Sequence, residues 1–240
     1  MFKFNTIWRD NTMKTIFIIF FLLIAIPAFA GTWIDNFDDG NLDGWIKSDP
    51  WNAGASWNIN NGKLIAISEM AEGWDAHLYL EISTLWKDYE VSVRSKIVKC
   101  FSKTLCGTGL LVRRPSSRQY VQFAVLSDYV EVGPCLQLYE MNNNGCEEEE
   151  PIKPFNVELE IWYDMKITVK GDEFKCYLNN SLVMSHKFSK FKLGALGLAI
   201  NGGEIHFDNF SVTGDEVPDN TKSVESIGKL TTTWAQLKRK

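Results

Sequence analysis

Residues Asp164–Leu178 read DMKITVKGDEFKCYL, and this stretch decides the fold class. Apolar residues occupy every second position on both sides of the dipeptide Gly171-Asp172, which is typical of a tight turn. A period of two is that of a half-buried β-strand, because successive side chains of a strand point to opposite faces. The stretch therefore predicts a hairpin with one apolar face.

The same strand-turn-strand pattern recurs along the chain at intervals of roughly ten residues. Two further hairpins are expected over residues 57–67, around the turn NNG at 60–62, and over residues 109–126, around Pro115-Ser116-Ser117. Residues 89–97 (YEVSVRSKI) alternate in the same way, and no stretch before the C-terminus has a convincing helical period. We expect an all-β sandwich or barrel.

The two ends of the chain differ from this pattern. Residues 16–26 form an unbroken apolar run of eleven, preceded by Lys14 and followed by small residues at Ala28 and Ala30. This is the layout of a secretory signal peptide, since a membrane anchor, the alternative, needs about 20 apolar residues. We expect a signal peptide at 1–30, a β-domain at 31–214, a polar linker and tail at 215–240, and a secreted or periplasmic protein without stable membrane insertion after cleavage.

Charge argues against nucleic acid as a partner. Without residues 1–30 the chain keeps 22 basic and 29 acidic side chains, a net charge of −7. The only basic cluster is Lys238-Arg239-Lys240 at the end, whereas nucleic-acid binding requires a basic surface. A neutral or weakly charged partner such as a carbohydrate fits better.

Five cysteines fall within the expected β-domain. Cys100 and Cys106 flank one short segment, and Cys135 and Cys146 flank another that is rich in Asn. In an oxidising compartment each pair is expected to form a disulfide. Zinc binding is the alternative, but the spacings differ from a C-x-x-C knuckle. Cys176, in an alternating strand, is expected to be a buried thiol.

Seven segments together resemble the concanavalin A-like lectin/glucanase superfamily, and in particular its laminin-G-like and 3-keto-disaccharide hydrolase members. They read DNFDDGNLDGW, WNINNGKLIAI, YEVSVRSKI, GTGLLVRR, YVQFAVL, YDMKITVKGDEFKCYLNNSLV and LGALGLAINGGEIHFDNFSVTG, and they extend over residues 33–214. The resemblance implies a jelly-roll sandwich of two curved antiparallel sheets, in which the first and last strands lie side by side.

The resemblance also implies a calcium ion between the first segment and the last strand. The triplet DNF occurs at residues 35–37 and again at 208–210, and the matching acidic positions are Asp35 or Asp38 and Asp208. Carboxylates and loop carbonyls are the oxygen ligands that Ca²⁺ prefers. The alternative is that these aspartates only form turns, and Phe37 and Phe210 are expected in the core.

No catalytic motif is evident. Family 16 glycosidases carry paired carboxylates in an E-x-D-x-x-E motif on a central strand, and the nearest stretch, residues 158–164 (ELEIWYD), departs from it. We expect a binding surface on the concave sheet face instead. Its candidate residues combine aromatic rings with polar groups, and the alternative for each is a solvated or packing position: Trp74, Arg94, Arg113, Tyr120, Gln122 and Tyr139.

Three functions follow from the sequence. The first is a non-catalytic module that binds carbohydrate or a glycan-like ligand. The second is a glycoside-processing enzyme of the 3-keto-disaccharide hydrolase type, and the third is a structural or adhesive module of the cell envelope. Other tryptophans, at positions 33, 45, 51, 57, 86 and 162, are expected to pack in or around the core.

Overall fold

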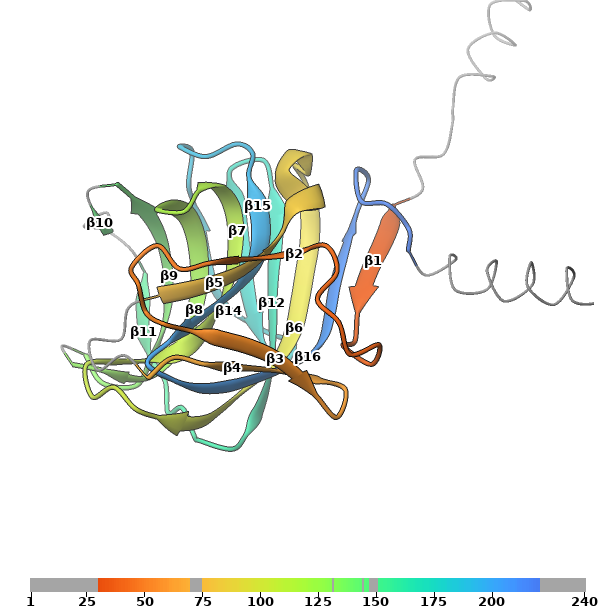
Figure 1. Ribbon diagram of the computed structural model, residues 1–240. Helices are drawn as coiled ribbons and strands as arrows, with labels where there is room; N and C mark the ends of the chain where they lie inside the picture. Colours follow the sequence, from red (N-terminus) through yellow and green to blue (C-terminus); the bar gives the residue numbers. More distant parts are fainter. Residues whose placement is uncertain (1–29, 70–74, 131, 144, 147–150, 221–240) are drawn as a thin grey trace, which may run out of the picture.

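The computed structural model describes residues 30–69, 75–130, 132–143, 145–146 and 151–220. The described chain forms two antiparallel β-sheets that face each other (Figure 1). Within it, no helix has the length and apolar character needed to cross a membrane. The expected signal peptide, except for Ala30, the residue Trp74 and the end of the tail lie outside the described residues.

Sheet A contains eight strands. From one edge to the other it holds β14 (Ser181–Lys187), β13 (Glu173–Leu178), β12 (Trp162–Lys170), β6 (Tyr89–Cys100), β16 (Gly203–Gly214), β4 (Lys63–Ile67) and β3 (Ser56–Asn60), with β1 (Gly31–Asp35) also paired to β16. The hairpin quoted above is β12–β13, and residues 57–67 form the hairpin β3–β4.

Sheet B also contains eight strands. Its order is β10 (Gly145–Cys146), β9 (Cys135–Asn142), β8 (Gln119–Tyr129), β7 (Leu105–Ser116), β15 (Ala195–Asn201), β5 (Asp75–Leu80) and β2 (Trp45–Ser48), with β11 (Ile152–Pro154) paired to β9. A 3-10 helix, η1 (Glu81–Leu85), directly follows β5.

The core fills the space between the sheets. In the long strands most residues that face the other sheet are apolar, for example Val121, Phe123 and Val125 in β8. Ser95 of β6 and Thr108 of β7 are polar exceptions and hydrogen-bond to each other between the sheets. The two sheets confirm the expected jelly-roll sandwich. Its physical basis is the period of two in the sequence, which gives the long strands one apolar face to bury.

The first strand, β1, pairs with the last strand, β16, in sheet A, and we call this pairing the seam. Thr32 pairs with Thr213 and Asp35 with Phe210 in an antiparallel register. Behind this seam the Phe210 ring packs against Trp33 and Trp45, with ring centroids 5.9 and 4.9 Å apart. Phe37 and Phe210 are fully buried, as expected. The side-by-side placement of the chain ends therefore rests on an aromatic cluster.

One of the two expected disulfides is present. Cys100 in β6 of sheet A is bonded to Cys106 in β7 of sheet B, so this bond joins the sheets. The expected pair Cys135–Cys146 forms no disulfide, and that prediction is wrong. The β9–β10 register sets Cys146 opposite Met141, and the six residues from there to Cys135 span roughly 20 Å of strand, whereas a disulfide needs Cα atoms about 4–7 Å apart. Cys176 is buried, as expected.

Candidate functional site

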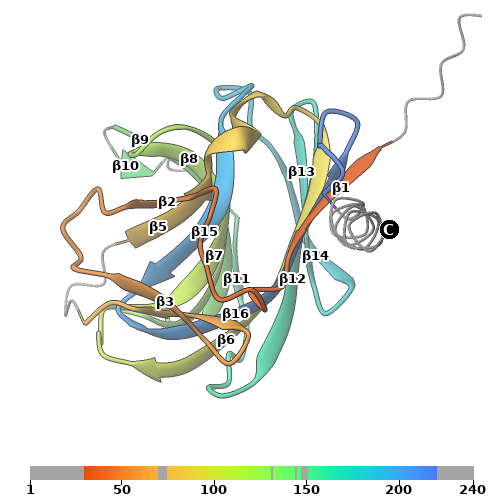
Figure 2. The same ribbon diagram turned by 45° about the vertical axis from the view of Figure 1, so that its right-hand side comes forward.

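The outer face of sheet B, which points away from sheet A, is concave (Figure 2). Polar residues such as Asp75, His77 and Gln122 lie on this face. The middle strands of sheet B present small residues there, Gly107 and Gly109 in β7 and Gly197 and Ala199 in β15. A Cβ atom at Gly109 would lie 2.5 Å from the amide nitrogen of Gln122. The glycines therefore leave room for larger side chains to lie across the middle of this concave face.

Asp75 is the centre of the polar group on the concave face. Tyr120 and Tyr139 donate their hydroxyls to its Oδ2 atom at 2.6 and 3.3 Å, and the Asn201 amide donates to Oδ1. These residues come from β5, β8, β9 and β15, and only β5–β15 and β8–β9 are neighbouring strands. The curvature of the sheet is what brings the four side chains together.

His77 lies beside Asp75 on the same strand face. It is fully buried, its Nε2 atom is 3.8 Å from Asp75 Oδ2, and its ring meets Tyr120 edge to face with centroids 4.9 Å apart. Neither ring nitrogen has a hydrogen-bond partner in the described chain, and the same holds for the buried Gln122 amide. These polar atoms are removed from water without a partner among the described residues, which is uncommon in folded proteins.

Burial and hydrogen bonding set the charges of this group. Burial lowers the pKa of His77 below its usual value although Asp75 opposes the shift, so the imidazole is neutral at pH 7. Burial alone raises the pKa of Asp75, but His77, Tyr120 and Asn201 outweigh it, and the net shift is downward. Burial and the Asp75 charge raise the pKa of Tyr120 well above 10. The group thus contains an ionised acid and neutral donors.

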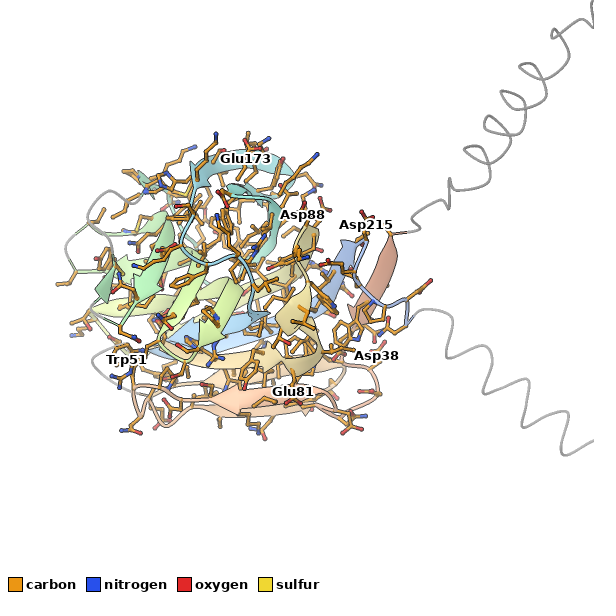
Figure 3. All side chains as sticks on the ribbon, turned by 90° about the horizontal axis from the view of Figure 1, so that it is seen from above. Asp38, Trp51, Glu81, Asp88, Glu173 and Asp215 are labelled. Atoms are coloured by element: carbon orange, nitrogen blue, oxygen red, sulfur yellow. A yellow bond between two sulfur atoms is a disulfide. The ribbon has the colours of Figure 1, made fainter. Side chains whose placement is uncertain are left out.

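A cavity of about 120 Å³ opens next to Asp75. Its described lining residues are mostly apolar or aromatic, with a few polar groups: Trp51, Asp75, Leu105, Leu126, Tyr129, Gln137, Tyr139, Met141, Cys146 and Asn201. Asp75 is the one carboxylate among them. Trp51 lies in the loop after β2, on the side of the molecule opposite Asp38 and Asp215 (Figure 3).

Of the six residues predicted to bind a ligand, the structure brings three together on the concave face: Tyr120, Gln122 and Tyr139. Arg94 lies in sheet A, where it pairs with Asp164 at 3.2 Å and its guanidinium lies 5.1 Å from the Trp162 ring centroid. Trp74 falls outside the described residues.

Arg113 is also placed away from the cavity. It has a φ of +49° and sits where a β-bulge shifts the register of β7. Its buried guanidinium donates from Nη2 to the carbonyl oxygens of Lys87 and Gly171, at 2.7 and 3.2 Å. The bulge turns the next residue, Arg114, onto the concave face, where its guanidinium lies 4.2 Å from the Tyr79 ring centroid. Alternation alone selects the wrong arginine, because a bulge breaks the period of two.

The aspartates of the seam are engaged in hydrogen bonds. Asp35 accepts from the Phe37 amide at 2.8 Å and from the Trp45 indole at 2.7 Å, and Asp38 accepts from the Asn36 amide group. Asp208 lies on β16 opposite Arg94 of β6. Within the described ranges no three His, Cys, Asp or Glu side chains are grouped to hold a metal ion. Backbone carbonyls also bind calcium, so calcium at the seam stays a prediction.

Sequence reasoning missed Asp75, His77 and Arg114 and assigned Trp51 to packing. The signal for the first two was present: in DAHLYL (75–80), Asp75, His77 and Tyr79 alternate with apolar residues, which places an acid and a histidine two positions apart on the non-core face. For Trp51, which lies in a loop, no periodic signal exists.

A family model described as the 3-keto-alpha-glucoside-1,2-lyase-like domain matches residues 32–213, which covers nearly all of the two sheets. The chain belongs to this family. No curated protein matches the sequence significantly.

Solved structures share the fold at low identity. The carbohydrate-binding module CBM66 from Bacillus subtilis is similar at a TM-score of 0.57 and 17% identity, with 71% of this chain and 96% of that chain covered. A β-1,3-1,4-glucanase (lichenase) from a mouse hindgut metagenome gives 0.56 and 13%, covering 78% and 100%. An endo-β-1,3-glucanase from Pyrococcus furiosus gives 0.54 and 11%, covering 76% and 93%. At these identities the likeness establishes the fold.

Proposed function

We propose that this protein is an exported carbohydrate-binding domain whose ligand occupies the concave face of sheet B. The observation that carries the proposal is the cavity beside Asp75, in which a buried carboxylate and hydrogen-bonding side chains meet an aromatic and apolar wall. Saccharide sites combine these two features, because a sugar ring has apolar faces and a rim of hydroxyl groups.

The cavity suits a small ligand unit. Drug-sized ligands occupy pockets of about 300–1,000 Å³, and a space of 120 Å³ suits part of one sugar ring. Trp51 and Tyr129 offer aromatic surfaces, while Gln137 and Asp75 offer polar atoms to hydroxyl groups. Family membership and the fold shared with a carbohydrate-binding module support the same ligand class.

Export is part of the proposal. The disulfide Cys100–Cys106 supports an oxidising compartment, because such bonds are rare in the cytosol. The apolar run at residues 16–26 supports it independently.

A second candidate is an enzyme that eliminates the alcohol from a 3-keto-α-glucoside, and it is favoured by the family match and by the neutral His77 beside Asp75. In a 1,2-elimination a base removes the C2 proton, the C1–O bond breaks, a C1=C2 bond forms, and the departing oxygen takes a proton. A neutral imidazole is able to accept such a proton. The double-displacement chemistry of glycosidases needs two carboxylates, whereas Asp75 is the one among the described cavity residues.

A titration with a panel of mono- and oligosaccharides tests the binding proposal. We expect Asp75→Asn to weaken binding of any hit at least tenfold, about 1.4 kcal/mol. The control is Asp164→Asn, an exposed change on sheet A that should leave affinity unchanged. Full affinity of the Asp75 variant would contradict the proposal. Release of the alcohol and an unsaturated keto sugar from a 3-keto-α-glucoside would favour the enzyme.

A further inference from the structure

Arg114 is a buried cation on the concave face that the cavity described above does not include. It follows the β7 bulge, is 6% exposed, and donates from Nη2 to the Ser48 hydroxyl of β2 at 2.8 Å. Its guanidinium stacks on Tyr79 of β5. These contacts hold the side chain against the sheet, so its position is fixed before any ligand arrives.

Arg114 forms no direct ion pair with an acid of the described chain. No described carboxylate lies within 4.0 Å of the Arg114 guanidinium, and its buried Nε atom has no acceptor in the same part of the chain. Asp49, in the neighbouring loop, accepts from the Ala53 and Gly54 amides. The Asp75 carboxylate accepts from two tyrosines and an asparagine.

A buried charge without a counter-ion is costly, and proteins therefore pair such charges or place them where a ligand supplies the partner. Burial lowers the pKa of Arg114, but a guanidinium stays charged at neutral pH. Its planar fork of N–H groups matches the two oxygens of a carboxylate.

Arg114 lies on the same sheet face as the polar group around Asp75. Its partner Ser48 lies opposite His77 in the β2–β5 register, and His77 is two residues from Asp75 on the same face. We propose that the ligand of the concave face carries a carboxylate, as a uronic acid does, and that Arg114 binds it. This inference rests on the proposed carbohydrate binding and specifies the class of sugar.

Matched sugar pairs test the inference on the full chain. Methyl glucosides, methyl galactosides and their uronic counterparts, with oligomers of each, are titrated by calorimetry. We expect the acidic member of a pair to bind at least tenfold more tightly, and this preference to shrink as salt is raised. Arg114→Gln should remove the preference, whereas Arg114→Lys should keep part of it, because lysine retains the charge and loses the fork.

Two controls keep the result interpretable. Arg94→Gln, on sheet A, should leave the preference unchanged. If Arg114→Gln fails to fold, Ser48→Ala leaves the arginine in place without its hydrogen bond and should reduce the preference. Neutral sugars binding as tightly as acidic ones would overturn the carboxylate inference and leave carbohydrate binding standing. Binding of neither class would overturn both.

Discussion

Asp35 and Asp75 are two hydrogen-bonded aspartates, one at each end of the sandwich, and they do different work. Asp35 accepts from a backbone amide and from the Trp45 indole, so it ties the chain next to the aromatic cluster. Asp75 accepts from Asn201 on the neighbouring strand, and from two tyrosines on more distant strands that approach it because sheet B curves. The acid-rich segment of the sequence therefore makes hydrogen bonds within the fold, and a single acid in a plain strand lies at the centre of the candidate site.

The pKa values of the two carboxyl groups are shifted in opposite directions. Burial raises the pKa of Asp35, although the Trp45 and Phe37 hydrogen bonds oppose it. At Asp75 burial also raises the pKa, but more donors reverse the shift. Asp75 is therefore held in its charged form by surrounding donors, as expected of a group that orients a ligand.

The largest effect is expected from removing the cluster that Asp35 supports. Phe210→Ala should lower the free energy of unfolding by about 3–5 kcal/mol, because it empties a fully buried aromatic site. Urea denaturation measures this loss. The reference is Tyr139→Phe, which keeps the ring and removes one hydroxyl on the concave face. A loss of unfolding free energy below about 1 kcal/mol would mean that the aromatic cluster behind the seam does not stabilise the domain.

The two aspartates themselves should separate stability from binding. Asp35→Ala leaves the partly buried Trp45 indole and Phe37 amide without their acceptor and should cost about 1–3 kcal/mol of stability. Sugar affinity below the unfolding transition should stay unchanged. Asp75→Asn should instead reduce sugar affinity by the tenfold factor given above, and this loss of affinity should be its main effect. Equal loss of affinity in both variants would remove the distinction.

The pH dependence of stability should have opposite signs at the two sites. Folded Asp35 holds its proton more tightly than the unfolded chain does, so its contribution falls as pH rises from 3.8 through the folded pKa. At His77 the unfolded chain takes up the proton first, so stability falls as pH drops below 6.5. Urea denaturation at a series of pH values from 3 to 8 gives the slope of stability against pH. Asp35→Asn should reduce the fall in stability above pH 3.8, and His77→Gln should reduce the fall below pH 6.5. Unchanged slopes would refute the assignment.

Calcium should give the smallest effect, because it has to compete with hydrogen bonds already made by Asp35 and Asp38. If the ion binds the seam, millimolar calcium should raise the melting temperature by mass action, and Asp208→Asn should abolish the rise. A melting temperature that neither calcium nor chelator changes would show that the aspartates act only through their hydrogen bonds.

Local patterns in the sequence were enough to predict the all-β class, whereas the jelly-roll arrangement was predicted from the family resemblance. The turn at Gly171-Asp172 and the alternation on either side specify β12–β13 without help from distant residues. The closure of the seam was predicted from resemblance, and the Phe37 and Phe210 burial agrees with it. The Cys135–Cys146 pair was misjudged because the position of a hairpin turn sets which residues face each other.

The site was harder to predict, because it depends on curvature and on one bulge. Tyr120, Gln122 and Tyr139 were selected as aromatic and polar candidates, and the β8–β9 register places them on one face. For Tyr120 and Tyr139 to meet Asp75, sheet B has to bend across the two or three strands that lie between them, which no local pattern encodes. The β7 bulge places Arg114, and not Arg113, on the concave face. The bulge depends on a positive φ at Arg113, a conformation that the sequence does not reveal for an arginine.

The seam also has a consequence for the order in which the chain folds. The Thr32 and Thr213 hydroxyls are in contact although 181 residues separate them. Pairing such distant segments costs more loop entropy than any hairpin of the domain and slows folding. During synthesis β1 emerges first and waits unpaired until β16 has been made. The aromatic cluster can form only at that point, so sheet A is completed after the whole domain has left the ribosome.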